Sequence, residues 1–374
     1  MSRWQWRGRV ALAGVALAFI LYPLTPADDV ISSDWPAFAT GAHLVVSDPA
    51  HLYDLDAQQK VELEVTGGRR LVTLGIHGIL PFLAPAWVAL LAVPFALAGA
   101  DLGGRLWVLF GLACLGAGIW LATRRRPWLE SLPAFAGVPT ALLLLNAQLD
   151  GVVALGIGAA VALWSRPYLA GLALGLTLMK PQLVLPLGLG LFVARQWRVL
   201  AGWVAAGVVL WASVAVLNWR WVLDWLAQTG NTVTSGSREV DLPHLGTLLP
   251  AGMQTDAVVV LTVLTIFAVI ALGRRRTDDF QRTFGILVSG GVLAAPHALP
   301  ADLVLVALGL TIWGQAEWHD WLVLSIAAVL TAVTPAPVPA FIAVPVIAYL
   351  LLRISGVIEL RRRRRLEPRA ASTG

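Results

Sequence analysis

The sequence contains little charge. Only 13% of its 374 residues are charged, whereas 58% are hydrophobic, and soluble domains carry roughly 25% charged residues. A soluble protein of this length needs more charge to cover its surface, and disordered chains have low hydrophobicity and high charge. The composition therefore excludes both classes.

Several chemical signatures are also missing. The single cysteine, Cys114, lies in an apolar run and cannot form an intramolecular disulfide. The six histidines are scattered without a His-x-x-His pair, and no Walker-type or Gly-x-Gly-x-x-Gly loop occurs. We therefore expect no metal ion and no nucleotide as cofactor.

Long apolar stretches make up most of the sequence, and the mean hydropathy is +0.75. Since a membrane-spanning helix needs about 20 apolar residues, we predict an all-α, polytopic helical bundle of about 12–13 hydrophobic segments. It would form a single integral membrane domain over residues 1–374. The segments lie near residues 10–27, 71–98, 106–122, 131–147, 149–164, 168–179, 182–194, 199–217, 256–272, 283–299, 302–315, 321–334 and 338–353.

Basic clusters predict the orientation, because cytoplasmic loops carry an excess of Lys and Arg. The clusters at the N-terminus, at Arg124–Arg126 and at Arg361–Arg365 place both termini in the cytoplasm of a multi-pass plasma-membrane protein, with a basic tail over 359–374. The hydrophilic segments 28–70 and 218–255 then become extracytoplasmic loops. The net charge of +5 favours membrane lipids over nucleic acid as a partner.

The segment count conflicts with this orientation. Thirteen crossings cannot join a cytoplasmic start to a cytoplasmic end. We therefore expect one stretch within 71–122 to be re-entrant or to double back, as its prolines permit.

Polar side chains at membrane depth are costly and indicate functional sites. In the predicted orientation they share the outer side of the membrane, where they could form one vestibule that binds a phosphate and polarises a hydroxyl. We expect the lysine among them to be a lone ammonium. The candidates are Asp34, Asn146, Gln148, Lys180, Gln182, Arg238, His297 and Asp302.

Each candidate also has a purely structural interpretation. Asp34 could cap a helix, Asn146 and Gln148 could bond between helices, and Lys180 could extend its ammonium to the interface. Glu62, in the first outer loop, is expected on a solvated helix face. These alternatives remain open from the sequence.

The polar segments match the motifs of a known family in chain order. They are Ser33-Asp34-Trp35-Pro36-Ala37-Phe38, Asp48-Pro49-Ala50-His51-Leu52-Tyr53-Asp54, Asn146-Ala147-Gln148, Leu178-Met179-Lys180-Pro181-Gln182, and Pro296-His297 through Asp302-Leu303. From about residue 30 to 310, the chain thereby resembles glycosyltransferase family 87, the DUF2029 group. It departs from the family pattern at Ala84-Pro85-Ala86, Ala147 and Ala295, where Tyr-Pro-Pro, Gly and Ser are usual.

The resemblance implies a GT-C-like fold with outer-face loop helices and a membrane hexosyltransferase. Such an enzyme would move a hexose, expected to be mannose, from a polyprenyl-phosphate sugar to a glycolipid or glycan acceptor at the extracytoplasmic face, with inversion. Asp34 corresponds to the family's proposed base. Lys180 and Arg238 would neutralise the departing phosphate. The remaining candidates, Asn146, Gln148, Gln182, His297 and Asp302, would bind substrate without a metal.

Two other functions fit parts of the sequence. Proline-broken helices are typical of transporters, which would suit a flippase for polyprenyl-linked sugars. However, the sequence shows no internal repeat. A non-catalytic membrane assembly protein could also keep the fold without the chemistry.

Overall fold

The computed structural model confirms the all-α class. It describes residues 30–69, 71–73, 76–78, 80–124, 126, 128–234, 245–249, 251–274, 279–334 and 338–358. Within these ranges the only sheet is an antiparallel hairpin of β1 (Leu71–Thr73) and β2 (Ile76–Gly78). The first apolar segment, Arg238 and the tail at 359–374 lie outside the described residues.

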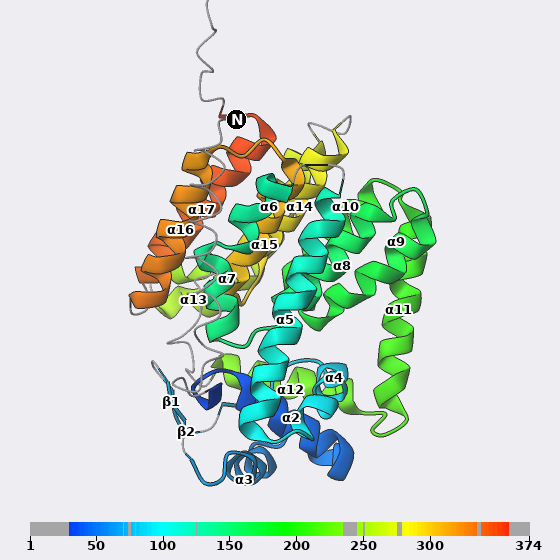
Figure 1. Ribbon diagram of the computed structural model, residues 1–374, viewed down its shortest axis with the longest axis vertical. Helices are drawn as coiled ribbons and strands as arrows, with labels where there is room; N and C mark the ends of the chain where they lie inside the picture. Colours follow the sequence, from blue (N-terminus) through cyan, green and yellow to red (C-terminus); the bar gives the residue numbers. More distant parts are fainter. Residues whose placement is uncertain are drawn as a thin grey trace, which may run out of the picture.

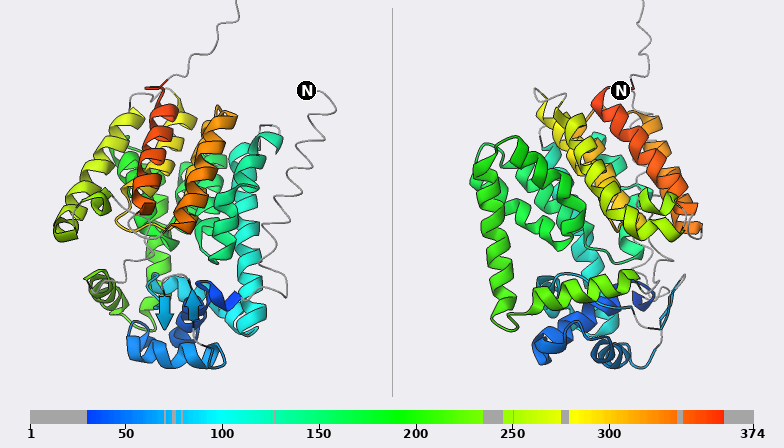
Figure 2. Two further views of the ribbon diagram at one scale, coloured as in Figure 1. Left: turned by 90° about the vertical axis from the view of Figure 1, so that its left-hand side faces the viewer. Right: turned by 180° about the vertical axis from the view of Figure 1, so that it is seen from behind.

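The helices form a main bundle and a smaller layer beneath it (Figure 1). The layer contains the hairpin and the helices of the first loop, and α12 crosses below the bundle (Figure 2). Its elements are η2 (Val30–Ser32), α2 (Trp35–Ser47), η3 (Pro49–His51), α3 (Leu55–Val65), α4 (Ala86–Ala96) and α12 (Trp221–Thr234).

The main bundle combines α-helices with short 3-10 helices. The α-helices are α5 (Ala100–Thr123), α6 (Trp128–Phe135), α7 (Val138–Leu145), α8 (Asp150–Ala162), α9 (Pro167–Leu174), α10 (Leu185–Val193), α11 (Trp197–Ala215), α13 (Ala251–Arg274), α14 (Phe280–Ala294), α15 (Leu303–Trp313), α16 (Trp318–Val333) and α17 (Val338–Ser355). The 3-10 helices are η4 (Gly175–Met179), η5 (Pro181–Val184), η7 (Leu245–Leu248) and η8 (Pro300–Asp302).

Four of the described helices are long and apolar enough to cross a membrane, so the chain is a multi-pass membrane protein. They are α5, α11, α17 and the Ala257–Arg274 part of α13. Several of the other apolar helices are too short to cross a bilayer on their own. At 1.5 Å per residue, α8 is only about 20 Å long, whereas the hydrocarbon core measures about 30 Å.

The apolar stretch 71–98 does not form one long helix. It contains the β1–β2 hairpin and then the 11 residues of α4, which carries Pro94 in its interior. A helix of this length spans about 16 Å, too little to cross a bilayer. The 24 residues of α5 are enough. Within 71–122 the irregular part is therefore the one before α5, and its re-entrant course stays a prediction.

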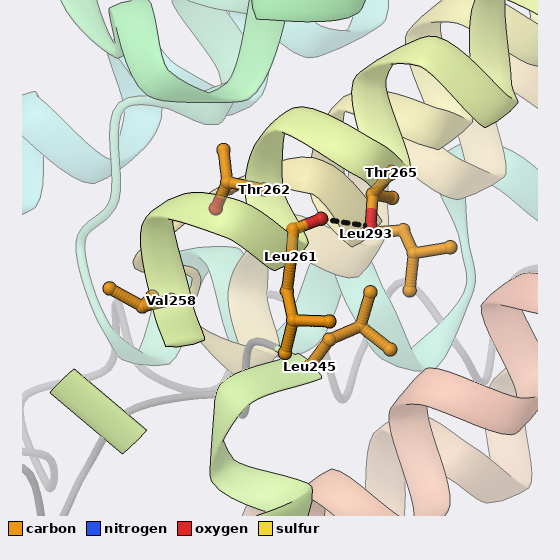
Figure 3. Close-up of a pocket in the computed structure, with 7 residues that line it drawn as sticks. Leu245, Val258, Leu261, Thr262, Thr265 and Leu293 are labelled. Atoms are coloured by element: carbon orange, nitrogen blue, oxygen red, sulfur yellow. Dashed lines mark hydrogen bonds between the residues drawn. The ribbon is translucent and has the colours of Figure 1, made fainter. Parts of the chain in front are cut away.

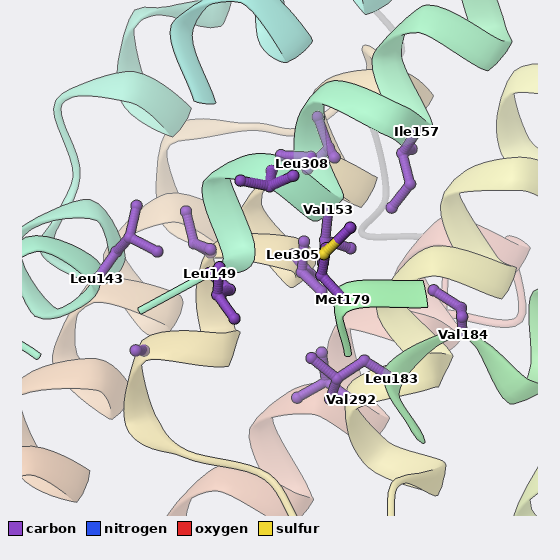
Figure 4. Close-up of a cluster of buried hydrophobic side chains, with 14 of the residues drawn as sticks. Leu143, Leu149, Val153, Ile157, Met179, Leu183, Val184, Val292, Leu305 and Leu308 are labelled. Carbon is purple, nitrogen blue, oxygen red and sulfur yellow. The ribbon is translucent and has the colours of Figure 1, made fainter. Parts of the chain in front are cut away.

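Glycines bring α5 and α8 into close contact. A Cβ atom added to Gly158 would overlap the backbone carbonyl of Gly118, and one added to Gly151 would overlap that of Gly111. Small residues of this kind let membrane helices approach backbone to backbone. Buried apolar side chains from α7, α8, η4, η5, α14 and α15 pack where the short helices meet (Figure 4).

This packing predicts opposite effects for two substitutions in the same helix pair. Gly158→Ala should destabilise the protein by about 1–3 kcal/mol, since the new methyl group meets backbone that cannot move aside. Gly111→Ala should be neutral or stabilising, because its Cβ would lie 3.6 Å from the Gln148 carbonyl oxygen, an ordinary van der Waals contact. Thermal unfolding in detergent measures both, and equal melting temperatures would contradict the packing.

Candidate active site

Three interruptions between helices lie at the end of the main bundle that faces the lower layer (Figure 1). The first separates α7 from α8, the second is the break at Lys180 between η4 and η5, and the third leads from α14 through η8 to α15. Prolines explain the last two, because Pro181 after η4 and Pro296 after α14 lack the N–H that would continue a helix. Six of the polar candidates occur at these three interruptions, namely Asn146, Gln148, Lys180, Gln182, His297 and Asp302.

The first interruption binds Asp34, which lies just before α2. The backbone N–H of Asp34 donates to the carbonyl oxygen of Asn146 over 3.3 Å. The side-chain amide of Gln148 donates to Asp34 Oδ2. Asp34 is partly exposed, whereas Gln148 is buried. The loop between α7 and α8 therefore fixes both the backbone and the carboxylate of Asp34.

This loop is itself anchored. Trp107 Nε1 donates a 2.9 Å hydrogen bond to the carbonyl oxygen of Ala147. Ala147 has φ of +50°, in the left-handed region that favours glycine. Glycine is therefore physically preferred at this position, one of those where the sequence analysis noted a departure from the resembled family.

The second and third interruptions meet in buried ion pairs. Lys180 Nζ lies 2.9 Å from Asp150 Oδ2 and 2.6 Å from Asp302 Oδ1. The other oxygen of Asp302 accepts the backbone N–H of Leu299 over 2.6 Å. All three charged side chains are buried. The expectation of a lone ammonium at Lys180 was wrong, because two carboxylates neutralise it.

The sequence places Asp150 in an apolar run, but it did not indicate that this residue pairs with Lys180. Asp150 is fully buried at the start of α8, and its Oδ1 has no hydrogen-bond partner among the described residues. It interrupts the same apolar run as Asn146 and Gln148, which was the only available signal. Lys180 is 30 positions away, so no local motif joins them.

The charges around Asp34 place several candidates in one neighbourhood. Burial raises the pKa of Asp34 to about 7, while the charges of Lys180 and His297 offset part of the rise and that of Asp302 adds to it. His297 is exposed, just after α14. A carboxyl group with a pKa near neutrality is suited to accept a proton at physiological pH.

The remaining candidates are placed unevenly. Asn146 ends α7 and is partly exposed, with its carbonyl oxygen on the N–H of Asp34. Gln182 is half-buried in η5, two residues after Lys180. Arg238 lies outside the described residues. The roles of all these side chains remain predictions.

A narrow, shallow apolar recess lies beside the third interruption (Figure 3). It lies between η7, α13 and the end of α14, and its lining includes Ala295, two residues before His297. The hydroxyl of Thr265 on its wall donates to the Leu261 carbonyl oxygen within α13. The recess therefore offers mainly apolar surface near His297.

Fold and site together define a membrane-embedded protein that keeps ionisable groups buried among apolar helices. Such burial is costly, so these groups indicate a functional site. The model of Glycosyltransferase family 87 matches residues 82–300, more than half of the chain. The chain belongs to this family, as its motifs predicted, and is a membrane glycosyltransferase. The match includes Lys180 and His297, whereas Asp34 precedes it. No curated protein and no solved structure matches the chain.

The buried ion pairs predict a large loss of stability when the ammonium is removed. Lys180→Met should cost about 3–5 kcal/mol, because it leaves two carboxylates buried without a counter-charge. Thermal unfolding in detergent measures this loss. Adding Asp150→Asn and Asp302→Asn should restore much of the stability. A Lys180→Met protein as stable as the parent would show that the ion pairs do not hold the site together.

Proposed function

We propose that the protein transfers mannose from a polyprenyl-phosphate sugar to a hydroxyl of a glycolipid or glycan acceptor, with Asp34 as general base. The observation that carries the proposal is the fixation of the Asp34 carboxylate by Gln148, close to the charges of Lys180 and His297. Family membership supplies the reaction class, which is glycosyl transfer. The donor, the acceptor and the residue roles are parts of this proposal.

The proposed step uses the two oxygens of Asp34 differently. Oδ2 is occupied by the Gln148 amide, which leaves Oδ1 for the acceptor. As the acceptor oxygen attacks C1 of the sugar, its proton passes to Asp34 and the bond from C1 to the phosphate oxygen breaks. Attack opposite the leaving group inverts the anomeric centre from β to α. General-base catalysis of this kind contributes about 10²–10⁴-fold to the rate.

The leaving group is a polyprenyl phosphate, whose charge must be stabilised as the bond breaks. Because two carboxylates already neutralise Lys180, we assign its ammonium to holding the site together. His297 is exposed and follows the apolar recess, so its ring N–H is better placed to donate to the phosphate. Arg238 of the outer loop would add a second donor, while Asn146 and Gln182 bind sugar hydroxyls.

The polyprenyl chain would leave the site between helices. The apolar side chains that line the recess beside Ala295 would border such a path next to His297. Each buried CH₂ group of a lipid chain contributes about 0.8 kcal/mol. The donor would therefore be held mainly by its tail and oriented by the polar residues at its head.

We assign the site to the extracytoplasmic face, with both termini in the cytoplasm. The α5–α6, α8–α9 and α10–α11 connections contain arginines in the sequence and lie at the end of the bundle opposite α2, α4 and α12 (Figure 1). Basic residues mark the cytoplasmic side. Lipid-linked donors suit the outer face because their activated leaving group travels with the sugar.

Replacing the base should abolish transfer. Purified protein with radiolabelled polyprenyl-phosphate mannose and membrane glycolipids should form a labelled product, and Asp34→Asn should slow the reaction at least about a hundredfold. Asp101→Asn is a matched control, since this exposed carboxylate pairs with Arg69 at the surface. Equal rates for Asp34→Asn and the parent would remove Asp34 from the mechanism. Movement of intact donor across vesicles without cleavage would instead indicate a flippase.

The raised pKa of Asp34 predicts a pH dependence with a definite sign. An acid whose folded pKa is about 7 is mostly protonated below this pH and cannot act as a base. The ratio kcat/KM should therefore rise as the pH increases from 6 to 8, with a midpoint near 7. A flat profile, or one that falls over this range, would contradict the assignment.

A further inference from the structure

A tryptophan of the lower layer reaches the segment that carries Lys180. Trp87 Nε1, in α4, donates a 3.1 Å hydrogen bond to the carbonyl oxygen of Leu178. In a 3-10 helix such as η4, the carbonyl of residue 178 would accept the N–H of residue 181. Residue 181 is proline and has no N–H. Trp87, in another helix, therefore supplies the hydrogen-bond donor that Pro181 lacks.

The ring of Trp87 is in turn fixed by other residues of the lower layer. It packs edge-on against Trp221 of α12, with the ring centroids 5.1 Å apart, and Trp221 is only 1% exposed. The chain just before Trp87 is bound from two sides. Trp225 Nε1 donates to the Leu83 carbonyl oxygen over 2.7 Å, and Tyr53 Oη donates to that of Ala84 over 2.9 Å.

A continuous set of contacts thus joins α12 to the buried ion pairs. It runs from Trp221 through Trp87 to Leu178, and two residues later Lys180 binds Asp150 and Asp302. Asp302 also accepts the N–H of Leu299, which belongs to the loop that presents His297. A shift of the Lys180 segment would therefore move the loop assigned to the phosphate.

We propose that Trp87 is a positioning residue that sets the Lys180 segment, and through it the His297 loop, by its single hydrogen bond to Leu178. This inference rests on the proposed transfer reaction. In this role Trp87 acts through the Lys180 segment and not by contact with the substrate. Losing its N–H should slow the chemical step while leaving substrate affinity nearly unchanged, because transition-state alignment is more sensitive to position than ground-state binding.

The sharpest test removes the N–H and keeps the ring. Replacing Trp87 by 3-benzothienylalanine puts a sulfur where the indole N–H is, so packing against Trp221 is retained. We expect kcat for mannose transfer to fall about tenfold, the equivalent of one lost hydrogen bond. KM should change less than about twofold, and amide hydrogen exchange should quicken in the peptide around Lys180.

Trp203 provides a matched control, because its Nε1 has no hydrogen-bond partner among the described residues. The same replacement there should leave kcat and hydrogen exchange as in the parent. A Trp87 variant with parental kcat and exchange would overturn the inference. If the parent transfers sugar and Asp34→Asn does not, that result would leave the proposed function standing. Absence of transfer by the parent would overturn both.

Discussion

The ion pairs of Lys180 with Asp150 and Asp302 join three parts of the chain that would otherwise be unrelated. Charges buried among apolar helices are very unfavourable unless they are paired. The start of α8, the break between η4 and η5 and the loop before α15 must therefore lie together. Once they do, Gln148 is beside Asp34 and His297 is within electrostatic reach of it. The geometry of the site follows from this constraint.

The lower layer supports the arrangement that these ion pairs impose. Gln58 and Glu62 of α3 bind backbone groups of Phe82 and Leu80, and α4 follows directly. The indole of Trp35 donates to the Ala100 carbonyl oxygen at the start of α5. These side chains thus satisfy backbone N–H and C=O groups that have no partner in regular secondary structure. This arrangement keeps α2, and with it Asp34, against the bundle.

Composition was enough to predict the helical membrane class, because low charge is visible in the sequence. The family was predicted separately, from the resemblance of the polar motifs and their order. Segment boundaries were less predictable. The apolar stretch 71–98 read as one span, whereas it contains a hairpin and a short helix, since hydropathy does not distinguish an apolar strand from an apolar helix. Glu62 was expected in solvent, yet it is 4% exposed and accepts the Leu80 N–H.

The candidate site, too, could be predicted from the sequence only in part. Proline and polar interruptions indicated where helices end, and therefore which residues lie at the interruptions. The sequence could not show that Lys180 binds two carboxylates, because its partners are 30 and 122 positions away and only folding brings them together. Nor could it show that the Gln148 amide binds Asp34 instead of being available to bind substrate. Those facts depend on tertiary packing.

The central claim concerns how a lipid-linked sugar would lie against Asp34. The most direct measurement is a structure of the protein with a non-cleavable phosphonate analogue of polyprenyl-phosphate mannose. Our account predicts the phosphonate beside His297, with C1 turning its opposite face towards Asp34 and leaving room for one acceptor hydroxyl within roughly 3 Å of the carboxylate. An analogue bound at the opposite end of the bundle, or with its phosphonate between Asp34 and C1, would contradict it.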